Sequence, residues 1–115
     1  MPQRSHPSPP PQEPTVAETV AALRRSGFTK SYGVHGNQVR DEETRELLPP
    51  TDFAIEEFYR FEGDSDPADE AIVMALENLG SRAHGILVAG YGPTASAEEN
   101  AVLPQFLDRR ARARG

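Results

Sequence analysis

The most regular pattern of apolar positions lies near the start of the chain. Thr15 and Glu18 match a capping box, in which each side chain binds a free backbone amide at a helix start. Gly27 follows as a left-handed cap, a conformation that glycine adopts without steric cost. The sequence therefore predicts a helix from Val16 to about Ser26, with an apolar stripe formed by Val16, Val20 and Leu23.

The middle of the chain holds three segments whose composition is typical of strands. Residues 54–62 are rich in aromatic and β-branched side chains, and residues 71–76 and 85–88 are apolar on both faces, as expected of central strands covered on one side by a helix. With a turn at residues 78–82, the pattern predicts three consecutive antiparallel strands. Strict alternation in the first predicts one face made of Ile55, Glu57, Tyr59 and Phe61.

The region between the helix and these strands has a weaker pattern. Residues 31–34 and 38–40 are short, and glycine and asparagine at positions 36 and 37 favour a turn between them. They predict a ragged hairpin. Residues 41–48 fit either a helical turn or a strand, and the sequence leaves both open.

The carboxyl-terminal region repeats the signature of a helix start. Ser96 and Glu99 match a capping box, which predicts a short helix through Leu103. Together the elements predict an α+β fold in which one N-terminal helix packs on a small, mainly antiparallel sheet of about four strands, followed by a short C-terminal helix.

Composition divides the chain into three parts. Six of the eleven prolines fall within residues 2–14, so residues 1–14 are predicted to be a disordered, proline-rich tail. Residues 15–95 form the single expected domain. Residues 96–115 are expected to be a short helix and a basic, flexible tail, which could contact its own domain, a second copy or an anionic partner through Arg109, Arg110, Arg112 and Arg114.

Charge and cysteine content narrow the classes of function. The formal net charge is −6, and residues 41–70 contain twelve acidic residues but only Arg45 and Arg60 as bases. Such a surface repels phosphate backbones, so we expect no nucleic-acid partner. The chain has no cysteine, which excludes disulfides and thiolate sites.

No apolar run is long enough for a membrane span, and the amino terminus has no apolar segment typical of a secretion signal. These features predict no membrane partner and a cytoplasmic location. A domain of this size has a thin core, so a homodimer or another protein partner is expected to add stability.

The acidic segment from Glu62 to Glu70 is the main candidate for chemistry. Carboxylates clustered in this way suit hard cations such as Mg²⁺ or Ca²⁺. The same segment has the composition of a solvent-exposed turn, and it departs from the EF-hand pattern. Both interpretations stay open, and the candidate metal ligands are Asp64, Asp66, Asp69 and Glu70.

The chain resembles a family of small, largely uncharacterised bacterial proteins over roughly residues 15–93. The family shares a Tyr-Arg-Phe-Glu-Gly-x-Ser-x-Pro-x-Asp signature, which residues 59–69 match, and a closing Gly-x-x-Val-x-x-Tyr-Gly, which residues 85–92 match. Many members are labelled phosphoribosylpyrophosphate synthetase. That label implies magnesium-dependent pyrophosphoryl transfer from ATP to ribose 5-phosphate, for which Lys30 is the one lysine available to clamp a phosphate.

Two hypotheses of function follow. The leading one is a non-catalytic binding or regulatory module with an acidic interaction surface, and it requires no cofactor. The alternative is the magnesium-dependent, phosphoribosylpyrophosphate synthetase-like enzyme that the resemblance implies. No catalytic residue is assigned, and the candidate binding surface consists of Tyr59, Arg60, Glu62, Asp64, Asp66, Asp69 and Tyr91.

Overall fold

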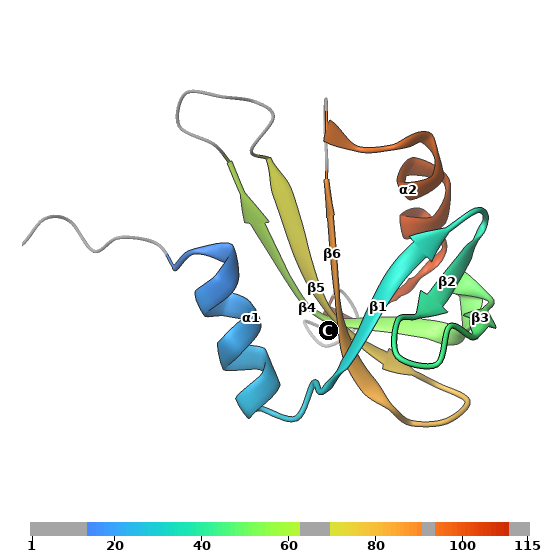
Figure 1. Ribbon diagram of the computed structural model, residues 1–115, viewed down its shortest axis with the longest axis horizontal. Helices are drawn as coiled ribbons and strands as arrows, with labels where there is room; N and C mark the ends of the chain where they lie inside the picture. Colours follow the sequence, from blue (N-terminus) through green and yellow to red (C-terminus); the bar gives the residue numbers. More distant parts are fainter. Residues whose placement is uncertain (1–13, 63–69, 91–93, 111–115) are drawn as a thin grey trace, which may run out of the picture.

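The computed structural model describes residues 14–62, 70–90 and 94–110 (Figure 1). Its elements in chain order are α1 (Val16–Arg25), β1 (Lys30–His35), β2 (Gln38–Asp41), β3 (Leu47–Leu48), the 3-10 helix η1 (Pro50–Asp52), β4 (Phe53–Phe61), β5 (Ala71–Asn78), β6 (His84–Gly90), α2 (Ala97–Val102), the 3-10 helix η4 (Leu103–Gln105) and β7 (Leu107–Asp108). None of the helices within these ranges is both long enough and apolar enough to cross a membrane.

The N-terminal helix and its caps are confirmed. The Glu18 amide donates to Thr15 Oγ1 at 3.1 Å, and the Thr15 amide donates to Glu18 Oε1 at 2.9 Å. At the other end Gly27 has a φ of 109°, and the amides of Gly27 and Phe28 bond back to the carbonyls of Arg24 and Leu23. This is the Schellman arrangement, which satisfies the last carbonyls of the helix.

Replacing Thr15 with alanine should lower the free energy of unfolding by about 1 kcal/mol, because it removes the acceptor for an amide of the first turn. Urea unfolding followed by circular dichroism measures the change. The exposed Thr51 is the matched control, and its alanine variant should stay within about 0.5 kcal/mol of the unmodified protein. Equal losses in the two variants would show that the cap is not what stabilises α1.

The seven strands of the described residues belong to one mixed sheet in the order β3-β2-β1-β6-β5-β4-β7. The pairs β1–β2, β2–β3, β4–β5 and β5–β6 are antiparallel, whereas β1–β6 and β4–β7 are parallel. The hairpin and the three consecutive antiparallel strands predicted from the sequence are therefore present. The sheet curls, and α1 and α2 lie on its opposite sides (Figure 1).

The predicted fold class is wrong. Within the described residues strands outnumber helices, and two α-helices accompany a curled seven-stranded mixed sheet, in place of a single N-terminal helix on a mainly antiparallel sheet of about four strands. Two of the missed strands, β3 and β7, contain two residues each, too few to show a periodicity. Both parallel pairings join segments that are distant in the sequence, which local patterns do not reveal.

The core is split between the two faces of the sheet. Leu23 of α1 packs with Val73, Ala75 and Ile86 on the outer face. The inner cluster lies within the curl and is larger; its members are Tyr32, Val39, Phe53, Ile55, Ile72, Met74, Leu76, Leu87, Ala89, Val102 and Phe106. Alternate residues of β5 serve the two clusters, which explains why its sequence is apolar throughout.

The segment after residue 95 contributes directly to this inner cluster. The predicted capping box is confirmed, since the Glu99 amide donates to Ser96 Oγ at 2.9 Å. Val102 of α2 is fully buried, and Phe106 lies 6.0 Å from Phe53 between ring centroids. The two apolar side chains therefore anchor the carboxyl-terminal segment to the sheet.

Arg109 binds carboxylates of its own domain, one of the three partners that the sequence left open. Its Nη1 lies 2.7 Å from Glu77 Oε1 and also contacts Glu56. Arg82 approaches the other oxygen of Glu77 at 3.2 Å. Glu77 itself is buried, so these cations compensate a carboxylate that would otherwise be costly to desolvate.

Candidate functional site

The predicted binding surface is only partly within the described residues. Asp64, Asp66, Asp69 and Tyr91 lie outside them, so their roles stay predictions. Glu70 is described, and its backbone carbonyl accepts a hydrogen bond from the Thr94 hydroxyl at 2.8 Å. The remaining predicted residues, Tyr59, Arg60 and Glu62, are at the end of β4.

The two central residues of that surface face opposite sides of the sheet. Tyr59 pairs with Val73, which belongs to the outer cluster, whereas Arg60 pairs with Ile72, which belongs to the inner cluster. Side chains of directly paired residues share a face. Arg60 lies 3.5 Å from Glu62 in an exposed ion pair. The structure therefore does not bring Tyr59 and Arg60 together in one cleft.

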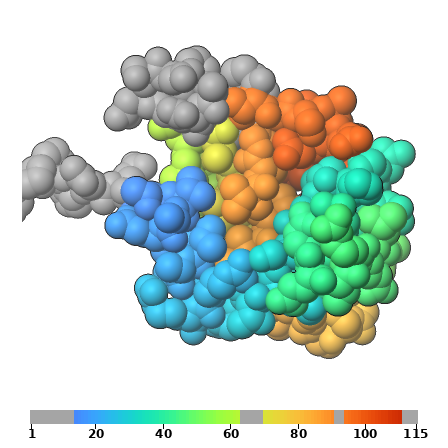
Figure 2. All heavy atoms as spheres, in the orientation of Figure 1, coloured from blue at the N-terminus to red at the C-terminus, as the bar shows by residue number. Residues whose placement is uncertain are grey.

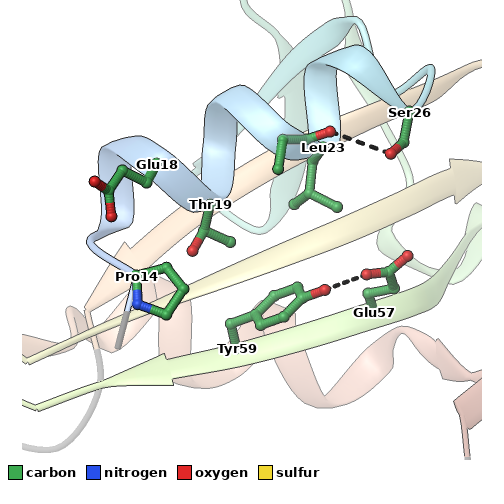
Figure 3. Close-up of a pocket in the computed structure, with 8 residues that line it drawn as sticks. Pro14, Glu18, Thr19, Leu23, Ser26, Glu57 and Tyr59 are labelled. Atoms are coloured by element: carbon green, nitrogen blue, oxygen red, sulfur yellow. Dashed lines mark hydrogen bonds between the residues drawn. The ribbon is translucent and has the colours of Figure 1, made fainter. Parts of the chain in front are cut away.

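Tyr59 instead takes part in a cavity between α1 and β4, which we call the α1–β4 cavity (Figure 3). Its volume is about 360 Å³, within the range of ligand pockets in proteins. Helix α1 and the residue before its cap supply most of the wall, and β4 supplies two side chains. The lining residues are Pro14, Glu18, Thr19, Ala22, Leu23, Ser26, Glu57 and Tyr59.

A β-bulge explains why Glu57 and Tyr59 reach this cavity. The pairing of β4 with β5 shifts between Ile55 and Glu57, so one extra residue lies between them. Ile55 points into the inner cluster, while Glu57 and Tyr59 turn toward α1. The alternation predicted from the sequence placed all of them on one face, and this is wrong for Ile55.

The lining of the cavity combines carboxylates with apolar side chains. The Tyr59 hydroxyl donates a hydrogen bond to Glu57 (Figure 3). That bond, burial and the negative charge of Glu57 all raise the pKa of Tyr59 above its ordinary value, so the phenol stays protonated at neutral pH. Glu18 is the other charged lining residue, and no cation lines the cavity among the described residues.

Sequence reasoning found Tyr59 but missed the contribution of α1. Thr19 is a buried polar residue on the helix, next to the predicted apolar stripe. A threonine at that position indicates a helix face that is not packed entirely against apolar side chains. The β4 half could also have been found, because the alternation of Glu57 and Tyr59 places them on one face.

The described part of the chain holds no group of three or more histidine, aspartate or glutamate side chains placed to bind a metal ion. The predicted Mg²⁺ or Ca²⁺ site depends on three residues outside that part and stays a prediction. Lys30, the candidate phosphate clamp, lies 2.7 Å from Asp41 and 3.4 Å from Glu43. Its ammonium is thus already bound by two carboxylates.

Comparisons of the chain with protein-family models, with curated proteins and with solved structures found no match.

Proposed function

We propose that the protein is a non-catalytic binding module that docks a basic segment of a partner protein on the α1–β4 cavity. The observation that carries this proposal is the charge of the lining. Glu18 and Glu57 stand at the cavity, and its other described lining residues are uncharged. Electrostatic complementarity therefore favours a lysine or arginine of the partner.

An arginine side chain fits the distribution of polar and apolar groups. Its aliphatic stem would pack on Ala22 and Leu23, as long basic side chains commonly do on apolar surfaces. Its guanidinium would bind the carboxylates, which accept several hydrogen bonds each. Tyr59 is 37% exposed, and its ring supplies a face for a cation–π contact.

A peptide selection tests the proposal. A random heptapeptide library displayed on phage, selected against the full chain, should yield peptides with arginine or lysine beside an apolar residue. Glu57→Gln should weaken binding of such a peptide about tenfold, because one charged hydrogen bond is lost. Fluorescence polarisation of the labelled peptide measures the affinity.

Glu98→Gln is the matched control, since it removes the same charge from the exposed first turn of α2. It should leave the affinity within about twofold. Peptides without basic residues, or equal weakening by both variants, would contradict docking at this cavity. If light scattering shows a dimer and a substitution of Tyr59 abolishes it, the cavity would instead be assigned to a second copy of the chain.

The described residues give no support to the alternative phosphoryl-transfer activity, which the resemblance implies. Its phosphate clamp would have to use Lys30, and that residue pairs with Asp41 and Glu43. We therefore propose the binding module alone.

A further inference from the structure

A cavity with a different chemistry lies beside the turn between β5 and β6, and we call it the turn-side cavity. Its volume is about 430 Å³. The start of β1, the end of β2, η1 and the residues from the end of β5 into the turn all contribute to its wall. The side chains that matter here are Lys30, Tyr32, Asp41, Glu46, Asp52 and Asn78.

Tyr32 carries a buried hydroxyl for which the described part of the chain supplies no hydrogen-bond partner. The residue is 5% exposed, and its ring packs edge-on against Phe53 at 4.9 Å between centroids. It also lies against Gly85, where an added Cβ would come within 2.6 Å of the ring. Among the described ranges no group forms a hydrogen bond with its hydroxyl. Buried tyrosine hydroxyls usually have a partner, so this one indicates a ligand or ordered water.

Asn78 adds a buried donor to the same cavity. It is 6% exposed, and its Oδ1 accepts from the amides of Gly80 at 2.9 Å and Ser81 at 3.2 Å. These bonds fix the side-chain orientation. Within residues 14–62, 70–90 and 94–110 the Nδ2 group has no acceptor. Two immobilised donors therefore line one cavity, both in need of an acceptor oxygen.

The charges around the cavity disfavour an anion. Lys30 is held by Asp41 at 2.7 Å, and two amides bind the other oxygen of Asp41. This ion pair is satisfied without a ligand. The remaining charged lining residues are Glu46 and Asp52, both exposed carboxylates that accept hydrogen bonds. A ligand with hydroxyl groups satisfies donors and acceptors together, whereas a phosphate would be repelled.

We propose that the turn-side cavity binds a small neutral sugar or other polyol, with Tyr32 and Asn78 donating to its oxygens and Asp52 accepting from a hydroxyl. An anion is disfavoured because the lining carries three carboxylates to one lysine, and the donors of Tyr32 and Asn78 need acceptor oxygens, which a simple cation lacks. This site is separate from the α1–β4 cavity and does not depend on the binding function proposed there.

An NMR titration of the full chain tests the proposal. The ¹⁵N-labelled protein is titrated with neutral pentoses, hexoses and inositol, and in parallel with their phosphorylated forms. At least one neutral ligand should shift the Asn78 side-chain signals and the Gly80 and Ser81 amides. Its phosphorylated form should bind about tenfold more weakly or not at all, because of the added negative charge.

Two matched variants decide whether the hydroxyl matters. Tyr32→Phe keeps the ring and removes only the oxygen, so the protein should fold and the sugar affinity should fall about tenfold. Tyr59→Phe makes the same change in the α1–β4 cavity and should leave the sugar affinity unchanged.

Three results would overturn the proposal. One is a panel in which no neutral ligand shifts these signals at about 50 mM, a concentration far above the dissociation constant of a specific site. Another is a Tyr32→Phe variant that binds as well as the unmodified protein. A third is tighter binding of the phosphorylated forms. Loss of thermal stability in Tyr32→Phe without any sugar binding would assign the cavity to ordered water alone.

Discussion

Replacing Phe53 with alanine should lower the free energy of unfolding by about 4 kcal/mol. Phe53 is fully buried, and its ring contacts Tyr32 of β1 and Phe106 after η4. It therefore joins three parts of the chain that are far apart in the sequence. Alanine would leave a cavity at this junction, and small domains have only about 5–15 kcal/mol of total stability.

Urea unfolding measures this loss, and Val88→Ala provides the control. Val88 is 47% exposed on the outer face, where Figure 2 shows β6 at the surface between α1 and the β1–β2 hairpin. Its alanine variant should change the stability by about 0.5 kcal/mol or less. A Phe53 variant that loses under about 1 kcal/mol would contradict the packing of Phe106 against the sheet.

Replacing Glu77 with glutamine should cost about 2 kcal/mol at neutral pH. The substitution leaves Arg109 and Arg82 without the buried carboxylate that they share. Thermal unfolding followed by circular dichroism measures the change. Glu62→Gln is the matched control, because Glu62 forms an exposed ion pair that contributes little.

The same variant should change how stability depends on pH. Burial raises the pKa of Glu77, but the hydrogen bond from Arg109 and the positive charges of Arg82, Arg109 and His84 outweigh it, so the pKa is lowered. Because the pKa of Glu77 is lower in the folded protein, Glu77 adds to the free energy of unfolding above its pKa in the unfolded chain, near 4.3. This stabilisation is lost as the pH falls through its pKa in the folded protein. Between pH 7 and pH 2, the free energy of unfolding should fall less steeply with pH in Glu77→Gln than in the unmodified protein. Identical slopes would show that folding does not lower the pKa of Glu77.

The sequence was sufficient at several positions where local chemistry determines structure. The capping boxes at Thr15 and Ser96, the left-handed Gly27 and the turn at Gly36 were all predictable, because each requires particular residue types within a few positions. Of the three antiparallel strands, the first followed from its aromatic and β-branched side chains and the other two from their apolar runs. What failed was the arrangement of the sheet, since the pairing of β1 with β6 depends on contacts between distant residues.

The candidate sites show the same limit. Tyr59 was predicted as a site residue, but its neighbours in space are on α1, and nothing in the β4 sequence names them. The bulge before Glu57 shifted the alternation, so the sequence wrongly placed Ile55 on the same face as Glu57 and Tyr59. Tyr32 and Asn78 were missed because an unpaired donor is defined by the absence of neighbours in space, which no local motif records.

The parallel pairing of β1 with β6 also bears on how the chain folds. The hairpins among β4, β5 and β6 close short loops, whereas Lys30 must meet Gly85 across most of the domain. Closing a long loop costs more entropy, so we expect the β1–β2–β3 unit to dock last and to open first. The turn-side cavity spans the contact between this late-docking unit and the rest of the sheet, with walls from β1 and from the end of β5. A molecule bound there would stabilise that contact and slow the first step of unfolding.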